Sequence, residues 1–400
     1  MPSAVQQALV LGNGRSGKAA AELLRREGVS VVVLEGDDAF PGGDFDLCVT
    51  SPGIALDHHW QIAARVAGIP VVSELQLGAE RWRARGGRML AVTGSKGKSS
   101  VVKLVADALG GVPCGNYGLP LCELVVDHWD GEGAALPWAV VEVSSFQLET
   151  TELPEDAFEA AALLNLQEDH LDRHGDVEVY HGLKRGLLGM AKVKVDGTAA
   201  GGEEPGEALL RDSYFDNPVL RTNGRCAIAL LRTAGLADAA IAAAFAGFEP
   251  LPHRMQKVSE TGGVTWIDDS KATSLAALAA GVEMAAARLS RAESESENRI
   301  LLIAGGLGKG DNPLSVIPRL RFGVKKVYLI GSCADQLLCA WRETVPCEVC
   351  GTLDRAVEAA RRDAISGDVV LLSPGTASFD QFKSYGARGD AFTALVRARE

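Results

Sequence analysis

The chain has 400 residues, of which 47% are hydrophobic and 23% are charged, and its net charge is −12. This composition is typical of a globular protein, and the length predicts two or three domains. No block of basic residues is present, which argues against nucleic acid as a main partner. No apolar run reaches the roughly 18 residues that span a bilayer, and no secretory signal precedes the first apolar stretch. We therefore expect a cytoplasmic protein without a membrane partner.

The first part of the chain alternates between predicted strands and helices, which indicates a parallel sheet with crossover helices. Strands are predicted at residues 8–12, 29–34 and 45–50, and a helix at residues 18–26. The basic residues 81–85, followed by Gly86 and Gly87, are predicted to form a linker.

Two further blocks of alternating elements follow the predicted linker. The second contains strands at 88–92, 138–143 and 160–165, helices at 101–109, 224–234 and 237–246, and an exposed loop at 197–205. The third contains strands at 264–268, 299–304, 326–330 and 368–372, and a charged helix end and loop at 286–297. The predicted fold class is therefore α/β throughout.

The first glycine-rich loop, Gly12-Asn13-Gly14-Arg15-Ser16-Gly17, lies between a predicted strand and a predicted helix. Glu35 ends the next strand. This is the spacing of a dinucleotide-binding loop, in which glycines let the backbone approach a pyrophosphate at a helix N-terminus. The motif indicates a site for a phosphate-bearing nucleotide, and alone it leaves a nicotinamide enzyme open.

The second loop, residues 93–100, reads Thr-Gly-Ser-Lys-Gly-Lys-Ser-Ser and also joins a strand to a helix. It lacks the first glycine of the full Walker pattern, where Val92 stands. Its backbone amides can nevertheless cradle phosphates, Lys98 can reach the β- and γ-phosphates of ATP, and the Ser99 hydroxyl can bind Mg²⁺. We predict an ATP-binding loop here.

With the motifs that surround it, this loop resembles that of the Mur ligase family, the ATP-dependent amide-bond-forming enzymes of peptidoglycan precursor synthesis. The family's loop reads TGxxGK(S/T), which accounts for the short spacing. The other matching stretches are Ser51–Ile54, Gly115–Pro120, Glu142–Glu149, Glu168–Arg173, Leu251–Arg254, Asp269–Thr273 and Leu372–Lys383. The match is best to members that add D-glutamate to UDP-N-acetylmuramoyl-L-alanine, and it covers nearly the whole chain.

The resemblance implies three domains. A Rossmann-like domain that binds the UDP-sugar is expected at residues 1–87, a central P-loop ATPase domain at 88–250, and a Rossmann-like domain that binds the incoming amino acid at 251–400. The first glycine loop is then a uridine-nucleotide site, which displaces the dehydrogenase interpretation. The implied substrates are UDP-N-acetylmuramoyl-L-alanine, glutamate and ATP, and the expected state is a monomer.

The resemblance also implies the reaction route and the residues that serve it. ATP would convert the carboxylate into an acyl phosphate, which the amine of glutamate attacks. Glu142 and Ser99 would bind one Mg²⁺, and His170 a second one between the acyl and γ-phosphate oxygens. Lys184 matches a lysine that is carbamylated in the family and thereby becomes a further acidic group near the metals. Lys98, Glu142, His170 and Lys184 form the expected catalytic set.

The remaining expected contacts fall into three groups, each carried over by motif. For ATP they are Gly94, Ser95, Lys96, Gly97, Lys98, Ser99, Ser100, Asn223, Arg254, Asp269 and Lys271. For the UDP-substrate they are Gly14, Ser16, Glu35, Ser51, Asn116, Ser144, Gln147 and His170, and for the amino acid Thr273, Lys309, Ser378 and Tyr385.

The sequence departs from the family pattern at several points. Lys96 replaces an asparagine, Tyr385 replaces a phenylalanine, and no basic residue follows Glu35. Of the central G-x-H-N-x-x-N motif only Asn223 is present, and the stretch before it is short, so part of the central sheet is expected to be absent or replaced. Two alternatives remain open: a relative that adds another amino acid such as L-glutamate, and a non-catalytic nucleotide-binding relative.

Overall fold

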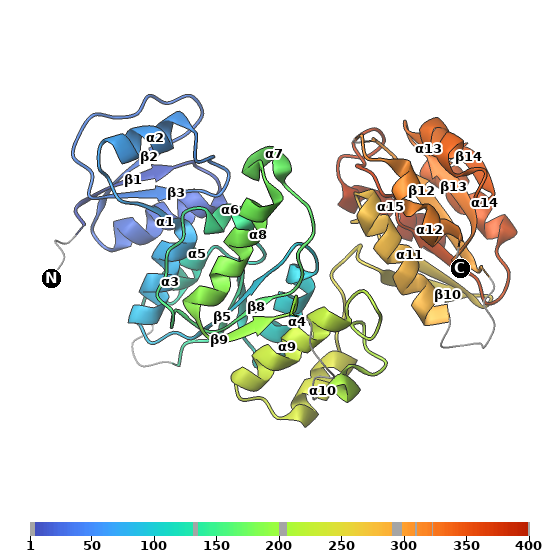
Figure 1. The fold of residues 1–400 in the computed structure, drawn as a ribbon, viewed down its shortest axis with the longest axis horizontal. Helices are drawn as coiled ribbons and strands as arrows, with labels where there is room; N and C mark the ends of the chain where they lie inside the picture. Colours follow the sequence, from blue (N-terminus) through green and yellow to red (C-terminus); the bar gives the residue numbers. More distant parts are fainter. Residues whose placement is uncertain are drawn as a thin grey trace. The chain divides into compact units, whose positions relative to one another are not determined.

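The computed structural model describes residues 5–130, 135–199, 206–289, 298–308, 310–321 and 323–398. Lys309, most of the predicted loop at 197–205 and most of the segment at 286–297 lie outside the described residues. The chain forms two compact units (Figure 1). The first contains residues 1–215 and 220–248, and the second contains residues 216–219 and 249–400.

The first sheet of the first unit is parallel, with the strand order β2-β1-β3-β4. Its elements are β1 (Gln7–Leu11), α1 (Arg15–Arg26), β2 (Ser30–Leu34), β3 (Leu47–Thr50), α2 (His59–Val66), β4 (Val71–Ser73) and α3 (Glu74–Ala84). Ala8 to Leu11 of the inner strand β1 are fully buried. The glycine-rich loop and Glu35 therefore follow the carboxyl ends of neighbouring strands, where α/β sheets bind ligands.

The prediction of a linker at residues 81–85 is wrong. Residues 81–84 belong to α3, where Trp82 is fully buried and Arg81 Nε lies 2.7 Å from a carboxylate oxygen of Glu27. The helix ends only after Ala84, and Gly86 then takes a left-handed conformation with φ of 79°. The arginines that indicated a linker therefore lie on the partly exposed side of α3, and the opposite side of this helix is buried in the core.

The second sheet of this unit is also parallel, with the order β6-β7-β5-β8-β9. Its strands are β5 (Met89–Thr93), β6 (Val112–Gly115), β7 (Ala139–Glu142), β8 (Phe158–Leu163) and β9 (Ala191–Asp196). Its helices are α4 (Lys98–Leu109), α5 (Leu121–Asp127), α6 (Ser145–Leu148), α7 (Leu171–His174), α8 (Val177–Gly186), α9 (Arg221–Thr233) and α10 (Asp238–Ala246), with short 3-10 helices at Leu187–Met190 and Glu207–Leu210. Helix α4 begins three residues earlier than predicted, so Lys98 is its first residue.

The second unit contains one sheet, ordered β10-β11-β15-β12-β13-β14, in which β10 is antiparallel to β11 and the other pairings are parallel. Its strands are β10 (Gln256–Thr261), β11 (Val264–Asp268), β12 (Ile300–Gly305), β13 (Val324–Ile330), β14 (Cys347–Gly351) and β15 (Val369–Leu372). Its helices are α11 (Leu275–Leu289), α12 (Ile317–Arg321), α13 (Ala334–Trp341), α14 (Leu353–Asp363) and α15 (Tyr385–Arg397), and a 3-10 helix spans Pro313–Val316.

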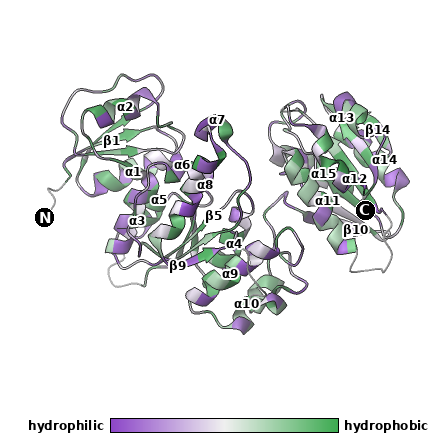
Figure 2. Ribbon diagram, in the orientation of Figure 1, coloured by the Kyte–Doolittle hydropathy of each residue, from purple (hydrophilic) through white to green (hydrophobic). Residues whose placement is uncertain are grey.

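Each unit is built around its apolar inner strands, such as β1 and β5, while the helices are apolar on one face and polar on the other (Figure 2). Every strand that we predicted is present, with bounds shifted by a few residues. No helix in the described part of the chain is long and apolar enough to cross a membrane.

Candidate active site

The phosphate loop, which we define as residues 94–100, consists of the turn between β5 and α4 together with the first three residues of α4, and it is shaped by two glycines. Gly94 and Gly97 have φ angles of 147° and 84°, which other residues rarely adopt. A Cβ atom on Gly97 would lie 2.0 Å from Nδ2 of Asn223, so the α9 side chain is packed directly against the loop. The predicted ATP contact Asn223 therefore does meet the phosphate loop, and the first turn of α4 offers backbone N–H groups to an anion there.

Two lysines converge on one carbonyl of this loop. Lys98 Nζ donates to Gly94 O at 2.9 Å, and Lys184 Nζ from α8 donates to the same oxygen at 3.0 Å. Lys184 is only 2% exposed, and its Nζ lies 4.7 Å from the centre of the Tyr180 ring. Burial, and next the charge of Lys98, lowers the pKa of Lys184 to about 7. The structure thus brings together Lys98 and Lys184, two of the four expected catalytic residues. With its lowered pKa, Lys184 is a neutral amine in a large fraction of the molecules near pH 7.

Three residues that the sequence analysis missed hold the phosphate loop in place. Asn165 accepts from Lys96 N and donates to Lys96 O, both at 2.9 Å, and it also donates to Asn223 Oδ1 at 3.2 Å. The Ser95 hydroxyl donates to Gln167 O at 3.0 Å and accepts from Tyr180 OH at 3.1 Å. The segment after β8 and the α8 residue Tyr180 therefore hold the phosphate loop in place through hydrogen bonds.

The Lys96 side chain, which the sequence left unexplained, points to this same segment. Its Nζ lies 3.7 Å from Oδ2 of Asp169, and both side chains are partly exposed. Because the ion pair is solvated, it adds little stability. It does place a cation between the phosphate loop and the residue that precedes His170.

Glu142 ends β7 and has one oxygen without a partner. Its Oε1 accepts from Asn116 Nδ2 at 2.6 Å, whereas Oε2 is buried and has no hydrogen-bond partner. A buried carboxylate oxygen in this state is costly unless a cation or a donor meets it, and this fits the expected Mg²⁺. Within the described residues, no group of three or more His, Cys, Asp and Glu side chains could hold a metal ion. The phosphates of ATP and water would have to supply most of the ligands, as is usual for Mg²⁺.

His170 lies on the segment after β8 and precedes α7 as its N-cap, with φ of 53°. The left-handed backbone turns the chain sharply there. Its ring centre lies 4.9 Å from that of Phe146, and its side chain is 47% exposed. The structure leaves this imidazole accessible.

The expected UDP contacts of the first sheet gather around the first glycine loop. A Cβ atom on Gly17 would lie 1.8 Å from Gly12 O, so α1 starts in close contact with the loop. Asn13 Nδ2 donates to Glu35 Oε2 at 2.7 Å, and Ser51 Oγ lies 3.4 Å from Gly12 O. Gly14 is the N-cap of α1 and Ser16 lies in its first turn, so an anion can be bound there.

Ser144 and Gln147, the other expected UDP-substrate contacts, cap α6. The Ser144 hydroxyl accepts from Gln147 N, and the Gln147 side chain accepts from Ser144 N at 2.9 Å. This reciprocal capping box fixes both side chains at the carboxyl end of β7, next to Glu142 in the chain.

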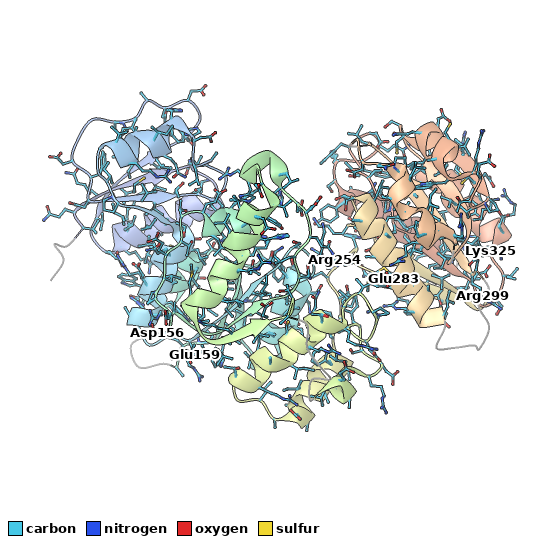
Figure 3. All side chains as sticks on the ribbon, in the orientation of Figure 1. Asp156, Glu159, Arg254, Glu283, Arg299 and Lys325 are labelled. Atoms are coloured by element: carbon cyan, nitrogen blue, oxygen red, sulfur yellow. The ribbon has the colours of Figure 1, made fainter. Side chains whose placement is uncertain are left out.

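In the second unit, the three expected ATP contacts lie at or near the first turn after β11. Asp269 accepts from Met255 N at 3.2 Å and from Ser373 Oγ at 2.9 Å, and burial raises its pKa to about 7. Lys271 Nζ lies 4.0 Å from the centre of the Tyr385 ring. Arg254 lies on the turn before β10 (Figure 3). Asp269 is engaged within the unit, while Lys271 rests on the aromatic ring expected to line the amino-acid site.

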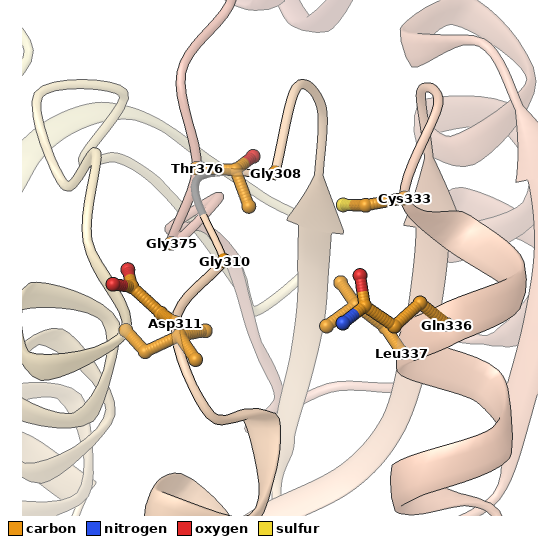
Figure 4. A pocket seen from close by; sticks show the side chains of 9 residues that line it. Gly308, Gly310, Asp311, Cys333, Gln336, Leu337, Gly375 and Thr376 are labelled. Carbon is orange, nitrogen blue, oxygen red and sulfur yellow. The ribbon is translucent and has the colours of Figure 1, made fainter.

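The expected amino-acid contacts lie on neighbouring segments of this unit. Gly375 N donates to Ala272 O at 2.8 Å, and Leu307 N donates to Ala377 O at 2.9 Å, so the chain around Thr273, the chain leading to Lys309 and the chain around Ser378 run side by side. A small pocket is lined by Gly308, Gly310, Asp311, Gln336 and Thr376, among others (Figure 4). Lys309 itself lies outside the described residues.

Buried Arg388, which the sequence analysis also missed, joins these segments from α15. It donates to Ser270 O at 3.0 Å and to Thr376 O at 3.2 Å. The Ser270 hydroxyl in turn donates to Tyr385 O at 2.8 Å. One guanidinium therefore sets the relative positions of the chain segments that carry Thr273, Ser378 and Tyr385.

Comparison with known proteins places this arrangement in a family. The model of the Mur ligase middle domain matches residues 130–199, and that of the Mur ligase glutamate ligase domain matches residues 253–376. The UDP-N-acetylmuramoylalanine--D-glutamate ligase of Nitratidesulfovibrio vulgaris is 35% identical over 440 residues, which covers 98% of this chain and 96% of that protein. The chain belongs to the Mur ligase family. The protein of the same name from Frankia casuarinae is 35% identical over 463 residues and covers 98% of the chain and 94% of its own length.

Solved structures of Mur ligases share the fold. A MurF ligase from Thermotoga maritima in complex with ADP has a TM-score of 0.57 at 14% identity and covers 99% of this chain and 97% of its own. The UDP-N-acetylmuramate-alanine ligase of the same organism has a TM-score of 0.55 at 14% identity, with 99% and 100% covered. The predicted family and the α/β fold class are confirmed, while the domain boundaries at residues 87 and 250 stay predictions.

Proposed function

We propose that this Mur ligase joins D-glutamate to UDP-N-acetylmuramoyl-L-alanine with the energy of ATP, in peptidoglycan precursor synthesis. The observation that carries the proposal is 35% identity over 98% of the chain to proteins named for that reaction. The phosphate loop, with Lys98 and Lys184 on one carbonyl, supports the use of ATP. We also propose that the protein works as a monomer in the cytoplasm.

The first step of the proposed reaction takes place on the phosphate loop. An oxygen of the substrate carboxylate attacks the γ-phosphorus of ATP, ADP leaves, and an acyl phosphate is formed. Both reactants are anions, so the residues around them must offset negative charge. Lys98, the helix N-terminus of α4 and Lys96 provide positive groups here, while Asn165 and Asn223 hold the loop in shape.

In the second step the amine of glutamate attacks the acyl carbon, phosphate leaves, and the nitrogen loses a proton as the amide forms. Thr273, Ser378, Tyr385 and Lys309 of the second unit are the proposed contacts of the incoming glutamate. Its two carboxylates need a cation and hydroxyl donors, which this set supplies. Arg254, Asp269 and Lys271 of the same unit are proposed as further contacts of ATP.

Mg²⁺ is the proposed metal, with two ions as the expected number. Glu142, whose buried Oε2 has no partner, and Ser99 would hold one ion, and His170 with Lys184 the other. When bound, the ions would neutralise phosphate charge during phosphoryl transfer. Glu142 is itself held in place by the Asn116 amide.

Carbamylation of Lys184 is proposed as the source of the second acidic ligand. A primary amine adds CO₂ only when it is neutral, and a lysine with an ordinary pKa is neutral to less than about 0.1% at pH 7. Because the pKa of Lys184 is lowered to about 7, about half of it is neutral at that pH. The addition forms an N–C bond and releases one proton from the nitrogen.

The function is tested by incubating the purified chain with ATP, Mg²⁺, UDP-N-acetylmuramoyl-L-alanine and either D- or L-glutamate. Phosphate release and product mass are measured. We expect one new product with D-glutamate, larger by one glutamate residue. A product with L-glutamate alone would support the relative of different specificity. No product with either isomer, in a preparation shown to bind ATP, would support the non-catalytic relative.

A further inference from the structure

Arg173 of α7 connects three chain segments of the first unit through one guanidinium group. Its Nη2 donates to Ile54 O at 3.1 Å, on the loop of residues 51–54 that follows β3, which we call the 51–54 loop. The same group binds both oxygens of Glu149, the residue after α6, with Nε and Nη2 at 3.1 and 2.6 Å. His170 lies three residues before Arg173 in the chain.

The surroundings of this guanidinium fix it further. The Glu149 side chain is 5% exposed, and His174 Nδ1 lies 3.3 Å from its Oε1. The other ring nitrogen of His174 lies 3.0 Å from Ser145 Oγ, so α7 is fastened to α6 twice. The Arg173 guanidinium also lies 5.0 Å from the centre of the Phe146 ring, and this ring packs against His170. Few alternative positions remain for the arginine.

Each of the connected segments carries a contact that we propose for the UDP-substrate. Ser51 lies on the 51–54 loop beside the first glycine loop, where the diphosphate is expected. Ser144 and Gln147 lie at α6, and His170 precedes α7, where the sugar and the acyl group are expected. With these contacts, the nucleotide end and the reacting end of the substrate would be bound at different sheets, and Arg173 forms hydrogen bonds to a residue that follows a strand of each sheet.

We propose that Arg173 is a positioning residue that sets the distance between the diphosphate site and the acyl site, and so aligns the substrate carboxylate with the phosphate loop. This inference rests on the proposed function. Arginine suits the role because its planar fork reaches a carboxylate and a carbonyl at once, whereas lysine is a point charge on a flexible stem. The Arg173 side chain is 16% exposed, so water does not easily replace these bonds.

The test compares the affinities of UDP and of UDP-N-acetylmuramoyl-L-alanine by calorimetric titration. UDP occupies only the first-sheet end, so the ratio of the two affinities measures how well the reacting end is placed. We expect the wild-type chain to bind the full substrate more tightly than UDP. In Arg173→Lys we expect this gain to fall by about tenfold or more while the affinity for UDP stays within about twofold. Arg83→Lys is the matched control, since Arg83 pairs at 2.8 Å with Asp156. Figure 3 labels Asp156, which is an exposed residue of the first unit.

The outcomes separate the inference from the function on which it rests. A wild-type chain with no gain over UDP would overturn the proposed substrate, and the inference with it. If Arg173→Lys still binds the full substrate more tightly than UDP by the wild-type factor, the inference alone is overturned. An equal loss of affinity for UDP and for the full substrate would overturn it too, because a merely structural role predicts that result. If Arg173→Lys fails to fold, Glu149→Gln carries the test, because it keeps the arginine but removes its charged partner. We expect a smaller loss of the gain there, and an unchanged gain would count against the proposal.

Discussion

Lys184 lies in an environment unlike that of an ordinary surface lysine. It is buried beside Lys98, and its pKa is lowered to about 7. We expect Lys184→Ala to reduce kcat by at least about a hundredfold, because the alanine cannot carry a carbamate. Short carboxylic acids such as acetate should restore part of the activity, since they can occupy the space and supply the missing acid group, whereas bicarbonate should not.

Steady-state assays with and without acetate would check this prediction. Lys192→Ala serves as the control, because Lys192 is an exposed lysine of β9 that pairs with Glu159. Full activity of Lys184→Ala without any added acid would show that the carbamate is not needed.

Asn165 is the residue whose two hydrogen bonds define the backbone of the phosphate loop at Lys96. In Asn165→Asp the acceptor oxygen remains, but the amide donor is replaced by an oxygen that faces the Lys96 carbonyl. Loss of a hydrogen bond together with this repulsion is worth on the order of 1–2 kcal/mol. We expect the KM for ATP to rise about tenfold while the affinity for UDP is unchanged. Asn298→Asp is the control, because Asn298 is an exposed residue of the second unit whose amide donates to Arg321 O. An unaltered KM for ATP in Asn165→Asp would contradict the role of Asn165 in holding the phosphate loop.

The residues that the sequence analysis proposed for the site and those that it missed differ in how their roles are encoded. Lys98 was predicted from the chemistry of its loop, and Glu142, His170 and Lys184 from stretches that resemble the family's motifs; their catalytic roles stay predictions. Asn165 acts on Lys96, Tyr180 on Ser95, and Arg388 on Ser270, across 69, 85 and 118 positions of the chain. Nothing in the local pattern around such residues indicates a partner so far away.

At the scale of elements, Glu74 joins the first sheet to the second. It is the first residue of α3, is 1% exposed, and accepts from Cys122 N of α5 at 2.7 Å. A Cβ atom on Gly78 would lie 2.8 Å from the same nitrogen, so the two helices are in close contact there. Burial raises the pKa of Glu74 to about 7. The carboxyl group is therefore held in its neutral form at moderately acid pH.

The raised pKa predicts how the stability depends on pH. Between its ordinary value of 4.5 and about 7, the folded chain binds a proton on Glu74 that the unfolded chain has released. The free energy of unfolding should therefore fall as the pH rises through this range, by up to about 3 kcal/mol from this group. Asp269 contributes in the same direction, since its pKa is also raised to about 7.

Glu74→Gln keeps the acceptor for Cys122 N and should remove about half of this dependence. Denaturant titrations at a series of pH values would measure it. Glu80→Gln, which alters an exposed residue of the same helix, should leave the slope as it is in the wild type. Equal slopes for Glu74→Gln and the wild type would show that Glu74 is ionised in the fold.

The strands that the sequence analysis missed are β4, β6, β9, β10 and β14, and each of them lies at an edge of its sheet. Edge strands here are short or polar on their outer side: β9 reads Ala-Lys-Val-Lys-Val-Asp, and β6 contains Pro113. Inner strands such as β5 and β12 are buried on both faces and show as unbroken apolar runs. The prediction of a linker was wrong for a related reason. The arginines of α3 are partly exposed and give the segment a polar sequence, whereas its Trp82 is fully buried.

At the scale of the whole molecule, the two compact units carry different parts of the proposed reaction. The phosphate loop, Glu142, His170 and Lys184 lie in the first unit, and the expected glutamate contacts lie in the second. The alignment with the Nitratidesulfovibrio vulgaris relative is 440 positions long, whereas this chain has only 400 residues. The relative therefore contains segments that this chain lacks. The residues of the phosphate loop and of the proposed metal sites are nevertheless all present, which is why we expect both half-reactions to be retained.

Because the glutamate contacts are proposed to lie in the second unit, one substitution there should impair the second step of the reaction and leave the first step intact. In the full chain, Lys309→Ala should lose the cation that binds glutamate, raising the KM for D-glutamate by about a hundredfold, as expected for a lost charge-assisted contact. Formation of the acyl phosphate should continue at the wild-type rate, because Lys309 is proposed to contact the incoming glutamate, which does not take part in that step. Hydroxylamine, which converts an acyl phosphate to a hydroxamate, would measure this step in the absence of glutamate. Lys326→Ala, at a partly exposed lysine that pairs with Glu348 and Asp363, is the control. If Lys309→Ala abolished hydroxamate formation as well, the lysine would belong to the activation step, and the separation of roles between the units would be wrong.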